Sequence, residues 1–320
     1  MLDHDHSDHA HAHDHHGRGH SHAPRKFGRA FAIGVLLNLG FVMVESGAGW
    51  LSGSMALIAD AGHNLSDVLG LLMAWAAYAL SKRPASARYT YGLRGSSILA
   101  ALFNAIFLLI ACGAIGLGAI QRLIHPAPVQ SGTMMAVAAI GIAINLGTAL
   151  LFLRGSHDDL NIRGAFLHMA ADAAVSAGVV IAGLIVALTG LLWIDPAMSI
   201  VIVAVIVAGT WSLFRDALTM SLNGVPGGID TAEVTARLAG LPGVVAVHHV
   251  HIWPTSTTEV ALTAHLLMPQ PGGDDDFLAR TARLMHKEFR IGHSTFQIER
   301  GQCADASHDC DEPADARHQH

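Results

Sequence analysis

The stretch SILAALFNAIFLLIACGAIGLGAI, residues 97–120, contains no charged side chain. About 20 apolar residues are enough for a helix to cross the hydrocarbon core of a bilayer, so this stretch predicts a transmembrane helix. Five further stretches have a similar length and apolar character, at residues 30–51, 55–80, 132–153, 164–190 and 194–214. The sequence therefore predicts an α-helical membrane protein with six transmembrane helices.

The composition of the 320-residue chain excludes several other classes of protein. Only 14% of the residues are charged, against about 25% in soluble domains, which disfavours a cytosolic enzyme or a disordered chain. The net charge of -6 provides no basic surface for DNA or RNA, so we expect no nucleic-acid partner. Three cysteines are too few for a disulfide framework. The 22 histidines outnumber the 19 lysines and arginines, which indicates a role involving metal ions or protons.

The ends of the chain and its positive charges predict the domains and the orientation. Residues 1–26 mix histidines with aspartates, which is typical of a disordered metal-binding tail. Basic side chains gather in alternate connections between the apolar stretches, whereas the opposite connections hold only Arg122. The positive-inside rule then places both termini in the cytoplasm, with the protein in the inner (cytoplasmic) membrane. We expect a transmembrane domain at residues 27–223, a cytoplasmic domain at 224–300 and a flexible tail at 301–320.

The expected cytoplasmic domain has the sequence pattern of a small α+β unit. In chain order, the pattern predicts a helix capped by Asp230, a pair of strands at 244–253 and 258–268, an amphipathic helix at 274–289 and a strand at 294–299. This α-β-β-α-β order favours a small sheet with its helices on one face.

Two of the apolar stretches contain the pattern His-x-x-x-Asp, formed by His63 with Asp67 and by His168 with Asp172. A spacing of four residues puts both side chains on one face of a helix. Ionisable side chains inside a bilayer cost about 2.5–3.5 kcal/mol each, so they persist mainly when paired, hydrated or bound to an ion. Two imidazoles and two carboxylates supply the four ligands of a tetrahedral zinc site. The structural alternative is two His–Asp hydrogen bonds between helices, but the repeated spacing favours the metal site.

Three other polar side chains interrupt the apolar stretches. Asp60 lies one turn before His63 and is a candidate acceptor behind the ligands, or a charge that draws water toward them. Hydrogen bonds between packed helices explain Glu45 and Asn104.

The chain resembles the cation diffusion facilitator family of divalent-metal transporters from Phe27 to Glu299. The stretches that carry the resemblance are ESGAGWLSGSMALIADAGHNLSD (45–67), YTYGLRGSSILAALFN (89–104), LNIRGAFLHMAADAAVS (160–176), HHVHIW (248–253), LTAHL (262–266) and HSTFQIE (293–299). The resemblance implies a Y- or V-shaped homodimer with six helices per protomer and a metallochaperone-like (ferredoxin-like) cytoplasmic domain. It also implies that His63, Asp67, His168 and Asp172 form the transport site. Two histidines in that set favour Zn²⁺ over Mn²⁺, with Cd²⁺ and Co²⁺ as further candidate cargo.

The resemblance implies a second metal site, in the cytoplasmic domain. Its positions match His248, His265, His293 and Glu299. Some relatives bind metal in the second cytoplasmic loop, but here that loop, residues 81–94, has no histidine or acidic residue, so we expect no site there.

Strand alternation and the C-terminal cysteines leave other interpretations of this second site open. Alternation places His249 and His251 on the face opposite His248, and predicts a core position for His251. A clamp by Cys303, His308 and Cys310 is a further alternative, although their spacing is not that of a standard zinc pair.

The ligand chemistry predicts how such a protein works. Zinc binds neutral imidazole and ionised carboxylate, so metal and protons compete for the same atoms. We therefore expect a Zn²⁺/H⁺ antiporter that exports zinc from the cytoplasm, with zinc also a regulatory ligand and no organic cofactor. A membrane metalloenzyme is the first rival, but Glu-x-x-His, H-E-x-x-H and G-x-S-x-G motifs are missing from the sequence. A membrane metal sensor or storage protein is the second.

Overall fold

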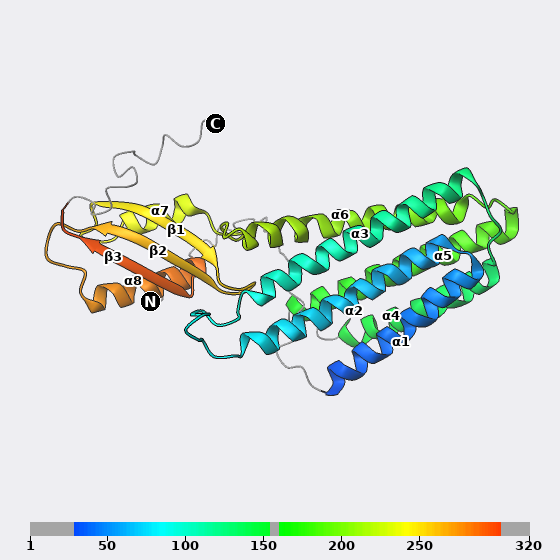
Figure 1. Cartoon of the computed structure of the whole chain (residues 1–320), viewed down its shortest axis with the longest axis horizontal. Coiled ribbons are helices and arrows are strands. Elements are labelled where there is room, and N and C mark those ends of the chain that lie inside the picture. The colour runs from blue at the N-terminus through cyan, green and yellow to red at the C-terminus, as the bar shows by residue number, and fades with distance from the viewer. Residues whose placement is uncertain (1–28, 154–159, 302–320) are drawn as a thin grey trace, which may run out of the picture.

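The computed structural model describes residues 29–153 and 160–301 of the chain. Six long helices lie side by side in an elongated bundle, and the C-terminal domain lies at one end of it (Figure 1). Their bounds are α1 Arg29–Ser52, α2 Met55–Ser81, α3 Ser96–Ile124, α4 Ser131–Leu153, α5 Leu160–Thr189 and α6 Ile194–Ser221. The predicted N-terminal tail lies outside the described residues, and so do residues 302–320. The latter include the proposed terminal clamp of Cys303, His308 and Cys310.

Within the described residues, four helices are long and apolar enough to cross a membrane. They are Val35–Ser52 within α1, the whole of α3, Met169–Thr189 within α5 and the whole of α6. In α4 the described apolar run is Ser131–Gly147, and α2 carries Asp60, His63 and Asp67 within its apolar sequence. A helical transmembrane domain is therefore confirmed, while the count of six spans remains a prediction.

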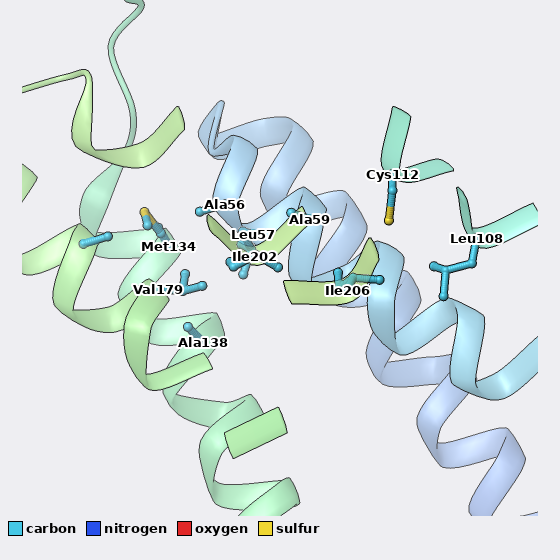
Figure 2. Packing of buried hydrophobic residues seen from close by; sticks show 11 residues of the cluster. Ala56, Leu57, Ala59, Leu108, Cys112, Met134, Ala138, Val179, Ile202 and Ile206 are labelled. Carbon is cyan, nitrogen blue, oxygen red and sulfur yellow. The ribbon is translucent and has the colours of Figure 1, made fainter. Parts of the chain in front are cut away.

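The interior of the bundle contains a cluster of apolar side chains from five helices, α2 to α6. Leu57 of α2 and Met134 of α4 are fully buried, and Val179 of α5 and Ile202 of α6 belong to the same cluster (Figure 2). Large apolar side chains cover the outside instead, and Trp50 is 80% exposed. In water such a surface would be unfavourable, but it suits contact with lipid.

The start of α2 is held by a buried carboxylate from the distant helix α6. The Asp195 carboxylate accepts hydrogen bonds from the backbone N–H of Met55 at 2.7 Å, the N–H of Ala56 at 3.3 Å and the hydroxyl of Ser54. Helix N-termini have unpaired N–H groups and attract negative charge. Asp195 therefore fixes the position of α2, the helix that carries the first His-x-x-x-Asp pair.

The C-terminal domain follows the predicted α-β-β-α-β order. Its elements are α7 Thr231–Ala239, β1 Ala246–Pro254, β2 Val260–Leu267, α8 Asp275–Phe289 and β3 His293–Glu299. The described strands form one sheet in the order β1-β2-β3, antiparallel between β1 and β2 and parallel between β2 and β3.

Both helices of this domain pack on one face of the sheet. Val234 and Leu238 of α7, Met285 of α8, and Leu262 and Leu266 of β2 are buried in one cluster. Alternation along β2 then directs His265 to the opposite face. The sheet thus presents one face to its own helices and leaves the other for a polar cluster.

The tip of the β1–β2 hairpin contacts the segment that leads into α3. Arg94 forms an ion pair with Glu259, and the Ser97 hydroxyl accepts a hydrogen bond from the Thr257 N–H at 3.1 Å. The rings of Tyr91 and His293 meet edge to face, with their centres 5.9 Å apart. These contacts join the loop between α2 and α3 to the C-terminal domain (Figure 1).

Candidate metal centres

The first candidate centre joins α2 to α5 and consists of His63, Asp67 and Asp172. His63 Nε2 lies 3.2 Å from Asp172 Oδ1 and 3.9 Å from Asp67 Oδ2. The three ligand atoms all lie within 4.8 Å of one another. Asp172 is buried and the other two side chains are partly exposed. We call this group the α2–α5 cluster; its geometry allows one divalent ion to be bound by all three side chains.

His168, the fourth residue of the predicted transport site, has its backbone in α5. It precedes Asp172 by four residues, so the two positions share a helix face. The side chain of His168 lies outside the described part of the structure. The structure therefore brings together three of the four predicted residues, while the role of His168 rests on its position in α5.

Two buried carboxyl groups lie beside the α2–α5 cluster without belonging to it. The Asp60 carboxylate accepts a hydrogen bond from Ser176 of α5 at 2.8 Å, and Glu45 of α1 accepts one from Asn64 at 2.9 Å. Both carboxyl groups are completely buried. These bonds connect α2 to α5 and to α1, which fits the predicted helix-packing role of Glu45 and places Asp60 as support for α2.

The second candidate centre lies on the open face of the C-terminal sheet. Glu299 of β3 contacts two histidines. Its Oε2 atom is 2.9 Å from His248 Nε2, and its Oε1 atom is 3.0 Å from His265 Nδ1. The two histidines are directly opposite each other on β1 and β2. All three ligand atoms lie within 4.8 Å of one another. We call His248, His265 and Glu299 the sheet cluster; two imidazoles and a carboxylate are ligands that zinc accepts.

His293, which the resemblance adds to this site, is not brought to the sheet cluster. It is the first residue of β3, whereas Glu299 is the last. At about 3.3 Å per residue, six positions separate the two by about 20 Å. His293 instead contacts Tyr91 at the junction with the helix bundle. Within one chain, its place is a contact between domains.

His249 lies beside the sheet cluster, contrary to the expectation from strand alternation. The register of β1 against β2 shifts between His248 and His251, and His249 has a positive φ of 49°. This bulge turns the His249 ring toward the cluster, with its centre 5.3 Å from that of His248 and 4.9 Å from that of His265. The core position expected for His251 is also wrong, because its side chain is exposed. The doubled histidine in HHVH was the only sequence signal.

Comparisons with known proteins identify relatives over most of the chain. Residues 31–220 match the family model described as the cation efflux transmembrane domain, and residues 226–301 match the cytoplasmic domain of cation efflux proteins. The zinc transporter ZitB of Escherichia coli K12 is 38% identical over 275 residues, which cover 85% of this chain and 87% of that protein.

Two further relatives and one solved structure are similar. The metal cation efflux system protein CzcD of Cupriavidus metallidurans is 35% identical, over 87% of this chain and 88% of that protein. A cadmium, cobalt and zinc/H⁺-K⁺ antiporter of Bacillus velezensis is 30% identical, over 85% and 88%. The solved metal-bound C-terminal domain of CzcD from Cupriavidus metallidurans is 29% identical, with a TM-score of 0.21, and covers 22% of this chain and 99% of that domain.

Proposed function

This chain belongs to the cation efflux family, and from that premise we propose that it exports zinc from the cytoplasm in exchange for protons. The family consists of transporters rather than enzymes, and relatives at 35–38% identity are named as zinc and metal cation efflux proteins. The chain is accordingly a divalent metal cation efflux protein that prefers zinc. Cadmium and cobalt, which the name of a more distant antiporter includes, are further expected cargo.

The observation that carries this proposal is the α2–α5 cluster. Asp67 and Asp172 supply two negative charges on two helices, and His63 lies between them at 3.9 and 3.2 Å. We propose that His168 completes the transport site as the fourth ligand. With both carboxylates ionised and both imidazoles neutral, the formal charge of -2 offsets the charge of the ion, which a site surrounded by hydrocarbon requires.

Proton coupling follows from the same ligand atoms. An imidazole nitrogen or a carboxylate oxygen that holds a proton cannot hold zinc, so binding of the metal releases protons and binding of protons releases the metal. Export then requires the α2–α5 cluster to face the two sides of the membrane alternately. Metal that enters from the cytoplasm leaves on the side where protons replace it.

We propose that the sheet cluster is a regulatory zinc site rather than part of the transport path. Its two imidazoles and one carboxylate form a donor set that fits zinc. The contacts of Arg94 and Ser97 with the β1–β2 hairpin and of Tyr91 with β3 give a direct connection from this domain to the α2–α3 loop and the start of α3. Zinc bound to the sheet would therefore favour one arrangement of the helix bundle.

We further propose a homodimer in the inner membrane with both termini in the cytoplasm. The model that matches residues 226–301 is named for a dimer of such domains, and the exposed apolar side chains of the helices fit a bilayer. The proposed organisation keeps the predicted domains: a tail at 1–26, a transmembrane domain at 27–223, the metal-binding domain at 224–300 and a second tail at 301–320.

Flux measurements in vesicles test the proposal directly. The purified full chain, reconstituted with a pH dye and a zinc dye inside the vesicles, should move zinc inward and protons outward together. A proton ionophore should abolish zinc movement that is driven by a pH gradient. Zinc binding without flux would favour a sensor or storage protein and overturn the proposed export.

A further inference from the structure

We propose that His249 is a fourth zinc ligand of the sheet cluster, so that one chain carries a complete site of three histidines and one glutamate. The inference deepens the proposed regulatory function and rests on it. Three observations lead to it: the backbone conformation of His249, the mutual distances of three imidazole rings, and the contrast with His251.

The backbone at His249 adopts a conformation that strands normally exclude. Among the described residues, three other than glycine have a positive φ: Asn223, His249 and Arg290. Asn223 and Arg290 directly follow or cap the C-terminal ends of α6 and α8, where left-handed residues are common. His249 lies inside β1 and has no such explanation. Residues held in this region cost free energy and gather at functional sites.

The bulge is what brings the His249 ring to the open face of the sheet. In a regular strand, neighbouring side chains point to opposite faces, and His249 would point away from His248. A bulge redirects one side chain, and here the His249 ring lies beside both His248 and His265. The strained conformation therefore has a definite result, a third imidazole at the sheet cluster.

The distances among the three rings match those expected for histidines on one zinc ion. Zinc binds imidazole nitrogen at about 2.0–2.1 Å in tetrahedral geometry. With roughly 1.1 Å from nitrogen to the ring centre, two such rings lie about 5.1 Å apart. The observed separations are 5.3 Å for His248 and His249, 5.4 Å for His248 and His265, and 4.9 Å for His249 and His265.

Glu299 and His251 define the limits of the site. Glu299 contacts His248 and His265 and supplies the negative charge that three neutral imidazoles lack. The ring of His251 is exposed, and its centre lies 6.4 Å from that of His249. His251 is therefore the matched control: it is a histidine on the same strand, but it lies outside the site.

One movement completes the site. The ligand atoms of His248, His265 and Glu299 already lie within 4.8 Å of one another, and the proposal requires a rotation of the His249 side chain that would bring one of its nitrogens to them. Simple packing of rings gives similar separations without a metal. The experiment must therefore separate a ligand from a packing residue.

The test uses the full chain in detergent with Asp67→Asn and Asp172→Asn in every sample, so that the α2–α5 cluster cannot hold the ion. Histidines of the N-terminal tail then contribute equally to all samples. Four variants are compared on this background: His249→Ala, His249→Gly, His251→Ala and His265→Ala. Zinc affinity is measured by competition with a chelator, and Co²⁺ absorption reports the coordination geometry.

We expect His249→Ala to lower the zinc affinity of one site per chain by at least about 10- to 100-fold. Loss of a residue that only hydrogen-bonds to a metal ligand already lowers metal affinity by that factor. The intense tetrahedral Co²⁺ bands should weaken in the same variant, and His251→Ala should change neither measurement. His249→Gly accommodates the positive φ and removes only the ring, so it should bind as weakly as His249→Ala.

Equal zinc affinity and equal Co²⁺ spectra in His249→Ala and His251→Ala would overturn the proposal. Wild-type affinity in His265→Ala would show that the sheet cluster binds no metal, which overturns it as well. Zinc flux by vesicles that carry His249→Ala in an otherwise unchanged chain is measured separately. Failure of the proposed transport function would appear there, as absent flux in the wild type, and is distinct from either binding result.

Discussion

The α2–α5 cluster and the sheet cluster use the same kinds of ligand in opposite proportions. The first has two carboxylates and one described imidazole, with His168 proposed as another; the second has two imidazoles and one carboxylate. The first lies between helices of the transmembrane domain, where the surrounding hydrocarbon compensates the charge of an ion poorly. The second lies on a sheet face outside the helix bundle; in both clusters one carboxylate is buried and the described histidines are partly exposed. The comparison teaches that the surroundings of a site set how much negative charge it must supply.

Removal of a carboxylate should therefore have its largest effect in the α2–α5 cluster. Asp172→Asn keeps the size of the side chain but leaves the complex with a net positive charge, a change worth several kcal/mol in a surround of low dielectric constant. We expect zinc flux in vesicles to fall to the background level, with normal insertion and assembly. Asp276→Asn on the exposed start of α8 is the matched control and should retain full flux.

Zinc flux at the wild-type rate in Asp172→Asn would contradict the assignment of the α2–α5 cluster as the transport site, on which the comparison depends. The α2–α5 cluster would then be a structural His–Asp pair, and the transport site would lie elsewhere. Measuring zinc and proton movement in the same vesicles also separates loss of transport from loss of coupling.

The helical half of the comparison was largely predictable from the sequence. A long apolar stretch predicts both the length of a helix and its contact with lipid, and the bounds of α1 to α6 follow the predicted stretches closely. A four-residue spacing fixes a shared helix face whatever the rest of the fold does. His63 and Asp67 could therefore be paired from their spacing alone, whereas Asp172 joins them because α5 faces α2.

The sheet half was predictable only in outline. The α-β-β-α-β order follows from local patterns and is confirmed. The position of His249 depends on a bulge, and the separation of His293 from Glu299 depends on the register of β3 against β2. Neither the bulge nor the register is encoded in the spacing of the histidines, so alternation misplaced His249. The matched motifs did supply His248, His265 and Glu299, which lie together.

The buried Asp195 carboxylate at the start of α2 was also not predictable from the sequence. Asp195 lies about 140 positions along the chain from Met55 and Ala56, whose N–H groups donate hydrogen bonds to it. No local sequence pattern predicts hydrogen bonds between residues so far apart. Asp195→Ala leaves those groups unsatisfied, at about 1–3 kcal/mol each. We expect a lower thermal unfolding midpoint in detergent and reduced zinc flux, with zinc affinity of the sheet cluster unchanged. Asp195→Asn, which keeps an acceptor oxygen, should lie between this variant and the wild type.

A smaller effect is expected when the sheet cluster loses its charge. Glu299→Gln keeps the shape of the side chain but removes the only carboxylate of that cluster. Because water reaches this face, we expect zinc affinity to fall about tenfold or more without loss of folding. The zinc concentration for half-maximal flux should rise, while flux at saturating zinc stays near the wild-type value. A loss of saturating flux would instead place the sheet cluster on the transport path.

His293→Phe should have the smallest effect. The variant decides whether His293 is a metal ligand, as the family resemblance implies, or a contact between domains, as the geometry indicates. Phenylalanine keeps a ring against Tyr91, whose contact with His293 is edge to face at 5.9 Å, and removes both ligand nitrogens. With the contact between domains preserved, we expect zinc affinity of the sheet cluster and the zinc dependence of flux to match the wild type. His293→Ala removes the ring as well and should shift only the zinc dependence of flux, because it weakens the junction with the α2–α3 loop. A tenfold loss of affinity in His293→Phe would mean that His293 is a ligand after all, supplied to the sheet cluster of the partner in the proposed dimer.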